Sequence, residues 1–197
     1  LSRRNPGWPC LPTDGGDLML AVEVTRPWLA AHLPRPMRVL SWAPFAPGFT
    51  QARHGVWREV RNADLTPDFD VDHWFAAEMV RWPDAVGMLT SRDIGTYQRA
   101  EVTVDGIRAA CLEALSIAVQ ARTAAVMEVG LHLDTGLATG TGTDCAALAC
   151  DPGEGRYAGL HTALGEAIGA ATRQAVAAAA ADWILWRDAE RIRRAGA

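Results

Sequence analysis

The chain has 197 residues, of which 49% are hydrophobic and 21% are charged, and its formal net charge is −4. This composition excludes intrinsic disorder, a collagen-like chain and a disulfide scaffold, and the negative charge disfavours nucleic acid or an anionic membrane as partners. All 19 basic residues are Arg, which excludes Schiff-base, P-loop and lysine general-base chemistry. The length predicts a single domain over residues 1–197.

The first half of the chain predicts mainly strands. Residues 1–16, rich in Pro and Gly, are expected to form an irregular arm. Short apolar or alternating runs predict strands over residues 18–24, 38–42, 56–60, 85–90 and 98–104. Asp70 or Asp72 can cap a helix that runs through Trp82, because Pro83 stops it.

The second half predicts mainly helices. Strong helix formers predict a helix over residues 112–128 that ends at Gly130. A Gly/Thr loop over 136–144, a short buried strand over 145–150 and a turn over 151–155 follow. A long Ala-rich helix is then expected from about His161 toward Asp182, with residues 183–194 as a candidate continuation. The fold class predicted is α+β: a mixed sheet with helices packed on it, strand-rich in the first half and helix-rich in the second.

Cysteine usage predicts neither a disulfide framework nor a metal site. The four cysteines (Cys10, Cys111, Cys145 and Cys150) show no C-x-x-C and no zinc-type spacing with His. Cys145 and Cys150 lie in an apolar stretch, where a thiol usually behaves as a small buried hydrophobe. The beginning of the chain lacks the apolar core of a secretory signal, and charged residues interrupt the apolar region 163–185, which excludes a membrane span there. The expected location is the reducing cytoplasm.

The densest polar motif is Ala138-Thr-Gly-Thr-Gly-Thr-Asp144. Alternate glycines allow close backbone approach, so successive N–H groups can converge on an oxygen or anion. One interpretation is a ligand loop with oxyanion donors and Asp144 as a base or orienter. The other is a tight connection in which Asp144 and the threonines bond their own backbone.

The segment Tyr157 to Gly169 is the second motif. His161 and Thr162 lie at the entry of the expected long helix, where backbone N–H groups are unpaired and the helix dipole is positive. A histidine there could act as a neutral base or donor, or it could simply cap the helix. The dipole alone favours Glu166, and glycines at 165 and 169 are typical of close helix packing.

A third group lies on the expected strands of the first half. Ser41 and Trp42 end one apolar run, and His54 and Trp57 lie in a run that alternates with arginines. These side chains could face an amide-rich ligand, although such alternation also marks a strand with one solvated face.

These motifs together resemble the adenosylcobinamide amidohydrolases. The resemblance rests on Ala138 to Cys145 followed by Tyr157 to Gly169, with further matches at 86–91 and 113–125 and a looser one at 39–42, and it covers about residues 38–176. It implies hydrolysis of the amide that joins aminopropanol to the corrin ring of adenosylcobinamide, in corrinoid salvage. It also implies a corrinoid substrate and no added cofactor or metal, because the cobalt belongs to the substrate.

Amide hydrolysis needs a group that activates water, donors for the tetrahedral oxyanion and an acid for the leaving amine. We assign proton transfer to Asp144 and His161. The residues expected to bind substrate come from all three groups: Thr139, Gly140, Thr141, Gly142, Thr143, Thr162, Glu166, Ser41, Trp42, His54 and Trp57.

The chain departs from the family pattern between Leu112 and Glu113. Relatives carry an additional stretch there, so we expect a segment to be missing from this chain at that position. The alternative function is therefore a corrinoid-binding carrier or sensor that has lost the reaction. The sequence leaves the oligomeric state open, homo-oligomers included.

Overall fold

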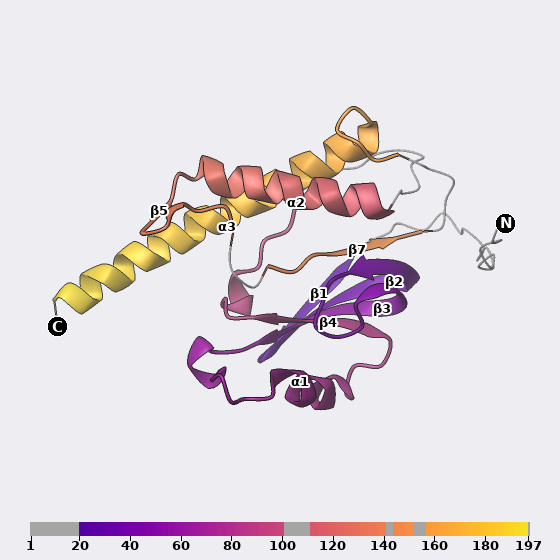
Figure 1. Ribbon diagram of the computed structural model, residues 1–197, viewed down its shortest axis with the longest axis horizontal. Coiled ribbons are helices and arrows are strands. Elements are labelled where there is room, and N and C mark those ends of the chain that lie inside the picture. The colour runs from indigo at the N-terminus through magenta and orange to yellow at the C-terminus, as the bar shows by residue number, and fades with distance from the viewer. Residues whose placement is uncertain (1–19, 101–110, 141–143, 152–156, 197) are drawn as a thin grey trace.

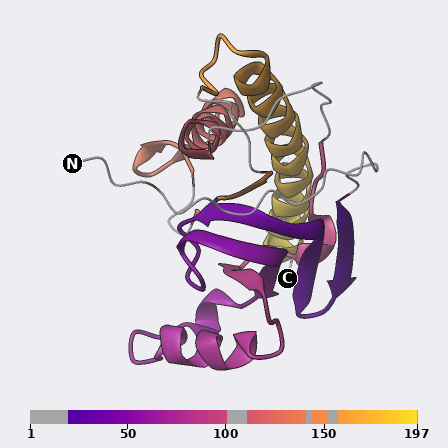
Figure 2. The same cartoon turned by 90° about the vertical axis from the view of Figure 1, so that its right-hand side faces the viewer.

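The computed structural model describes residues 20–100, 111–140, 144–151 and 157–196. Over this part of the chain the elements form three layers: a short helix, a mixed sheet and a pair of long helices (Figure 1). Figure 2 shows the same layers from the side. The expected α+β arrangement, with strands in the first half and helices mostly in the second, is confirmed. The arm over 1–16, residues 101–104 and most of the turn over 151–155 lie outside the described residues.

The sheet is organised around one long strand. Its members are β1 (Ala21–Thr25), β2 (Trp28–Ser41), β3 (Gly48–Glu59), β4 (Ala85–Thr90) and β7 (Ala147–Cys150). Along one edge of β2, β1 pairs with residues 28–32 and β7 pairs with residues 38–41, both antiparallel. β3 pairs antiparallel with the other edge of β2, and β4 continues the sheet parallel to β3.

β2 and β3 are much longer than the strands predicted over 38–42 and 56–60. β2 includes Pro34 and Pro36, although proline cannot donate to a strand ladder. The structure accommodates both between His32 and Met37, where the register with β3 shifts. A bulge of this kind tolerates proline. Both predicted strands were therefore too short.

The helix α1 (Val71–Met79) covers one face of the sheet. The Asp70 side chain, one of the two caps predicted from the sequence, accepts a hydrogen bond from His73 N at 3.0 Å. The helix ends three residues before Trp82, the predicted end. Its buried residues Phe75 and Met79 join a core cluster with residues of β2 and β3: Trp28, Ala30 and Val56.

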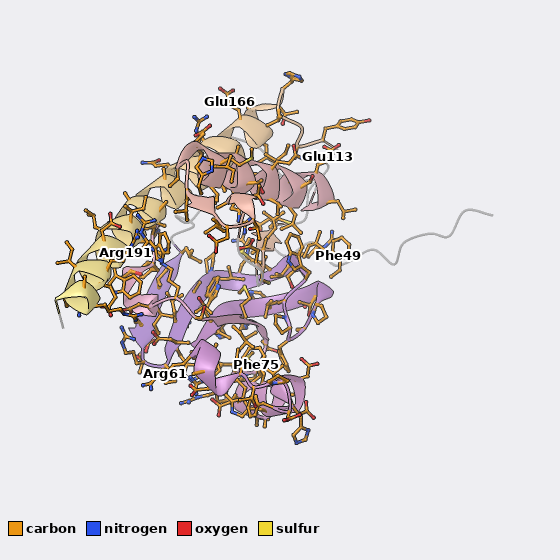
Figure 3. All side chains as sticks on the ribbon, turned by 60° about the vertical axis from the view of Figure 1, so that its left-hand side comes forward. Phe49, Arg61, Phe75, Glu113, Glu166 and Arg191 are labelled. Atoms are coloured by element: carbon orange, nitrogen blue, oxygen red, sulfur yellow. The ribbon has the colours of Figure 1, made fainter. Side chains whose placement is uncertain are left out.

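The helices α2 (Cys111–Glu128) and α3 (Ala163–Ala195) lie beyond the other face of the sheet. α2 ends just before Gly130, whose φ of +69° matches the predicted glycine stop. α3 continues without a break through 183–194 and projects past the end of α2 (Figure 1). A second core cluster lies on this face and contains Val39, Ala43, Ala52, Val86 and Met88. Figure 3 shows Phe75 on the α1 side and Glu113 and Glu166 on the helix pair.

Several connections differ from the sequence prediction. The first two residues of the expected Gly/Thr loop form β6 (Gly136–Leu137), which pairs with β5 (His132–Leu133) in a small hairpin. The strand expected over 145–150 is confined to β7, of which only Cys150 is buried. Residues 98–100 form no strand, and single 3-10 turns occur at η1 (Asn62–Asp64) and η2 (Ile94–Thr96). Within the described ranges, no helix is both long enough and apolar enough to cross a membrane.

Candidate functional site

Asp144 lies where the end of β2 meets the beginning of β7. Ser41 of β2 pairs with Ala147 of β7, which brings the residues just outside this pairing close together. Trp42 Nε1 donates a hydrogen bond to the backbone carbonyl of Asp144 at 3.1 Å. The Trp42 side chain nevertheless remains 47% exposed. The indole is thus fixed at its N–H edge, while nearly half of the residue stays accessible beside Asp144.

Arg122 of α2 holds the Asp144 side chain. Its guanidinium forms an ion pair with the Asp144 carboxylate and donates through Nη1 to the backbone carbonyl of Thr139 at 3.2 Å. Burial lowers the pKa of Arg122 from its ordinary value, but an arginine stays cationic at neutral pH. One side chain therefore ties α2 to both ends of the segment that carries the Gly/Thr motif.

The ion pair fills the space beside Gly140. A Cβ atom at residue 140 would fall on both the Arg122 guanidinium and the Asp144 carboxylate. Any side chain there would push the ion pair apart. Thr139 is exposed and contributes its carbonyl to Arg122. Thr141, Gly142 and Thr143 lie outside the described residues, so their expected role as oxyanion donors stays a prediction.

His161 lies at a different place on the helix pair. It is exposed and precedes α3, and three residues earlier the backbone N–H of Ala158 donates to Glu113 Oε2 in the first turn of α2. Arg122, which holds Asp144, is nine residues further along α2, about 13 Å by the rise of an α-helix. No contact among the described residues joins Asp144 and His161, so the structure does not bring the two proton-transfer candidates together.

The neighbours of His161 show mainly structural contacts. Thr162 is the N-cap of α3: its Oγ1 accepts from Gly165 N at 3.0 Å and donates to the Gly159 carbonyl at 2.8 Å. Glu166 is exposed in the first turn of α3. It lines a groove of about 700 Å³ between α2 and α3, together with small residues such as Ala121, Gly165 and Gly169. Asp144 is not part of this groove.

The remaining candidates are divided between the two faces of the sheet. Ser41 is buried, and its Oγ accepts from Ala43 N at 3.4 Å. Trp57 packs against the second core cluster, on the same face as Cys145. His54 lies on the opposite face, in ring contact with His32 and Trp82. His54 is therefore separated by the sheet from Asp144.

The structure thus gathers Trp42, Thr139, Gly140 and Asp144 around Arg122, a residue that sequence reasoning did not assign to the site. A guanidinium that fixes a carboxylate beside an exposed tryptophan can orient a general base and offer positive charge to a developing oxyanion. One signal for Arg122 was present in the sequence, because it is the only charged residue between Glu113 and Glu128 of the helix-forming segment.

Burial also affects the thiol next to Asp144. Cys145 is partly buried against the second core cluster, and this desolvation raises the pKa of its thiol above the ordinary 9.0. A thiol in such surroundings is a poor nucleophile at neutral pH. The site therefore has a carboxylate, and not this thiol, as the group able to accept a proton.

Comparison with protein families identifies a match. A family model described as adenosylcobinamide amidohydrolase matches the chain in two blocks, residues 17–113 and 107–187. The blocks overlap at 107–113, which includes the position where the sequence predicts a missing segment. No curated protein and no solved structure shows significant similarity to the chain.

Proposed function

The chain belongs to the adenosylcobinamide amidohydrolase family, and from this premise we propose that it hydrolyses adenosylcobinamide to adenosylcobyric acid and aminopropanol in corrinoid salvage and remodelling. The family match over most of the chain is the observation that carries the proposal. The carboxylate held beside an exposed tryptophan supports it, because amide hydrolysis needs a positioned base and a corrin needs apolar area.

In the proposed reaction, Asp144 removes a proton from a water molecule as the water oxygen attacks the amide carbon. The C–N bond then breaks, and the leaving amine takes up a proton while the acid product forms. Arg122 positions the carboxylate and lies where positive charge can stabilise the oxyanion, with N–H groups of the segment 139–143 as further donors. His161 stays a second proton-transfer candidate, for which no described contact with Asp144 provides support.

The exposed face of Trp42 is proposed to contact the corrin ring. The hydrogen bond from Nε1 to the Asp144 carbonyl fixes the indole plane relative to the catalytic carboxylate. Binding at this face would therefore place the substrate at a defined distance from the base. The reaction as proposed uses no added metal or organic cofactor and takes place in the cytoplasm.

The direct test is incubation of the purified chain with adenosylcobinamide, with chromatography and mass spectrometry of the products. We expect adenosylcobyric acid and aminopropanol in equal amounts. Asp144→Asn should lower turnover about 10²-fold or more, the usual contribution of a general base. The matched control is Asp134→Asn, the same change at an exposed residue of the β5–β6 turn, which should retain turnover.

The alternative is a corrinoid-binding protein without the reaction. The observation that favours it is the division of the family match at 107–113, where a lost segment could have carried part of the site. Binding of adenosylcobinamide that changes tryptophan fluorescence without any product would establish this alternative. Turnover in the wild-type chain that Asp144→Asn leaves intact would instead contradict the assignment of the base.

A further inference from the structure

Two histidines face each other on the α1 side of the sheet. His32 of β2 and His54 of β3 are directly opposite in the strand register, just before the register shift. Their Nδ1 atoms are 3.0 Å apart, and the two rings are nearly perpendicular, at 83°. Both side chains are only partly exposed. The strand pairing therefore holds two imidazole nitrogens close together.

The spacing of these nitrogens suits two ligands on one metal ion. With metal–nitrogen bonds of about 2.0–2.1 Å, two nitrogens are about 2.9 Å apart at a right angle and about 3.3 Å apart at the tetrahedral angle. The observed 3.0 Å falls within this interval. Only small ring rotations would be needed to direct both lone pairs at a shared ion.

Glu23 of β1 supports the tautomer that such a site needs. Its Oε2 lies 3.5 Å from His32 Nε2, so a proton on Nε2 is favoured and the Nδ1 lone pair of His32 is left available. A carboxylate on the outer nitrogen is the usual partner of a metal-bound histidine.

The wall of the cluster provides a further observation. Trp82 lies against both imidazoles, with ring centroids 6.4 Å from His32 and 6.0 Å from His54. Its Nε1 is buried and has no hydrogen-bond partner among the described residues. A buried indole N–H normally finds an acceptor, and a water or small anion on a metal ion would supply one.

We propose that His32 and His54 bind one divalent transition-metal ion of the zinc, nickel and copper class through their Nδ1 atoms, with Glu23 orienting His32. Within the described ranges, no group of three or more ligating side chains gathers. The chain thus supplies two ligands there, and water or an anion completes the coordination. The ion would join β2 to β3 on the sheet face away from Asp144, which gives it a structural role independent of the proposed hydrolysis.

The test uses the untagged chain, freed of metal by dialysis against a chelator and titrated with Zn²⁺ or Ni²⁺ in calorimetry. We expect binding of one ion with micromolar affinity, quenching of tryptophan fluorescence by Ni²⁺ and a rise in Tm, whereas Mg²⁺ and Ca²⁺ have no effect. His32→Gln and His54→Gln should each weaken binding at least tenfold. The matched controls His73→Gln and His132→Gln, at exposed histidines elsewhere, should bind as the wild type does.

Glu23→Gln keeps the test decisive if either cluster variant fails to fold, because Glu23 is largely exposed. Loss of such an outer partner typically weakens metal affinity about 10- to 100-fold, and we expect the lower end of that range. The proposal is overturned if the wild-type chain binds no ion at a protein concentration about 100-fold above the expected micromolar Kd. It is also overturned if Glu23→Gln and the folded His variants bind the ion as tightly as the controls do.

Discussion

The two faces of the sheet are covered in different ways. On one face, a helix of nine residues places Phe75 and Met79, both almost completely buried, into a core cluster. Gly87 of β4 allows this approach, since a Cβ there would be only 2.7 Å from Met79 Sδ. On the other face, long helices bring a charged pair, Arg122 and Asp144, next to the end of the sheet. We infer that the first face supplies stability and the second supplies the site.

The largest expected effect is on the α1 face. Phe75→Ala removes a fully buried ring, which typically costs about 3–5 kcal/mol of the free energy of unfolding. Urea denaturation measures this loss, and turnover per folded molecule should stay unchanged. Phe49→Ala is the matched control, because its side chain is 59% exposed, and it should cost less than about 1 kcal/mol. Equal losses in the two variants would contradict the division of roles.

Arg122 tests the opposite face. Arg122→Gln removes the charge that holds Asp144, and we expect kcat/KM to fall about 10²-fold, close to 2.7 kcal/mol of transition-state stabilisation. Arg122→Lys keeps the charge but cannot keep both contacts of the guanidinium. It should melt close to the wild type but recover only part of the activity. Full recovery of activity by Lys would show that charge alone, and not positioning, is required.

Gly140→Ala probes the same ion pair without changing a charged residue. The added methyl group displaces Arg122 from Asp144, so kcat should fall about tenfold, or about 1.4 kcal/mol. Gly169→Ala is the control, because a Cβ there meets nothing within 4 Å. In a helix that change should raise stability by up to about 1 kcal/mol. Melting curves and initial rates of both variants would separate the two effects.

The smallest expected effect concerns Cys145. Burial raises the pKa of its thiol above 9.0, so the reactive thiolate is scarcer in the folded chain than in the unfolded chain at any pH below that value. At pH 8, alkylation of Cys145 by iodoacetamide should be several-fold slower in the native protein than in urea. Mass spectrometry of the labelled peptide gives both rates, and equal rates would mean that this face is open to solvent at Cys145.

Local signals predicted the local parts of the fold well. Asp70 as a helix cap, Gly130 as a helix stop and the strand over 85–90 depend on neighbouring residues, and the structure confirms all three. The length of β2 was missed because the prolines at 34 and 36 are acceptable only where the register with β3 shifts. Because that shift depends on how two strands pair, it cannot be predicted from the sequence of one strand alone.

The candidate site was predicted only in part for a similar reason. The Gly/Thr motif drew attention to Asp144, but its partner Arg122 is 22 positions earlier in the chain and on a different element. His54 was grouped with Trp57 because the two are close in sequence. The strand alternation places His54 beside Trp82 and Trp57 in the cluster on the other face. Motifs identified the residues, whereas pairing across the sheet decided which of them meet.

The register shift inside β2 also separates its backbone amides into two sets, whose hydrogen exchange can be followed independently. Amides at residues 28–32 belong to the part of the sheet beneath α1, whereas those at residues 38–41 lie between β3 and β7, below the helix pair. Pro34 and Pro36 carry no exchangeable amide and separate the two sets. In hydrogen–deuterium exchange, local opening on the α1 side should therefore label the first set of amides and leave the second set protected, and opening on the helix-pair side should do the reverse. Exchange along this one strand can thus show whether the α1 side and the helix-pair side of the sheet open independently.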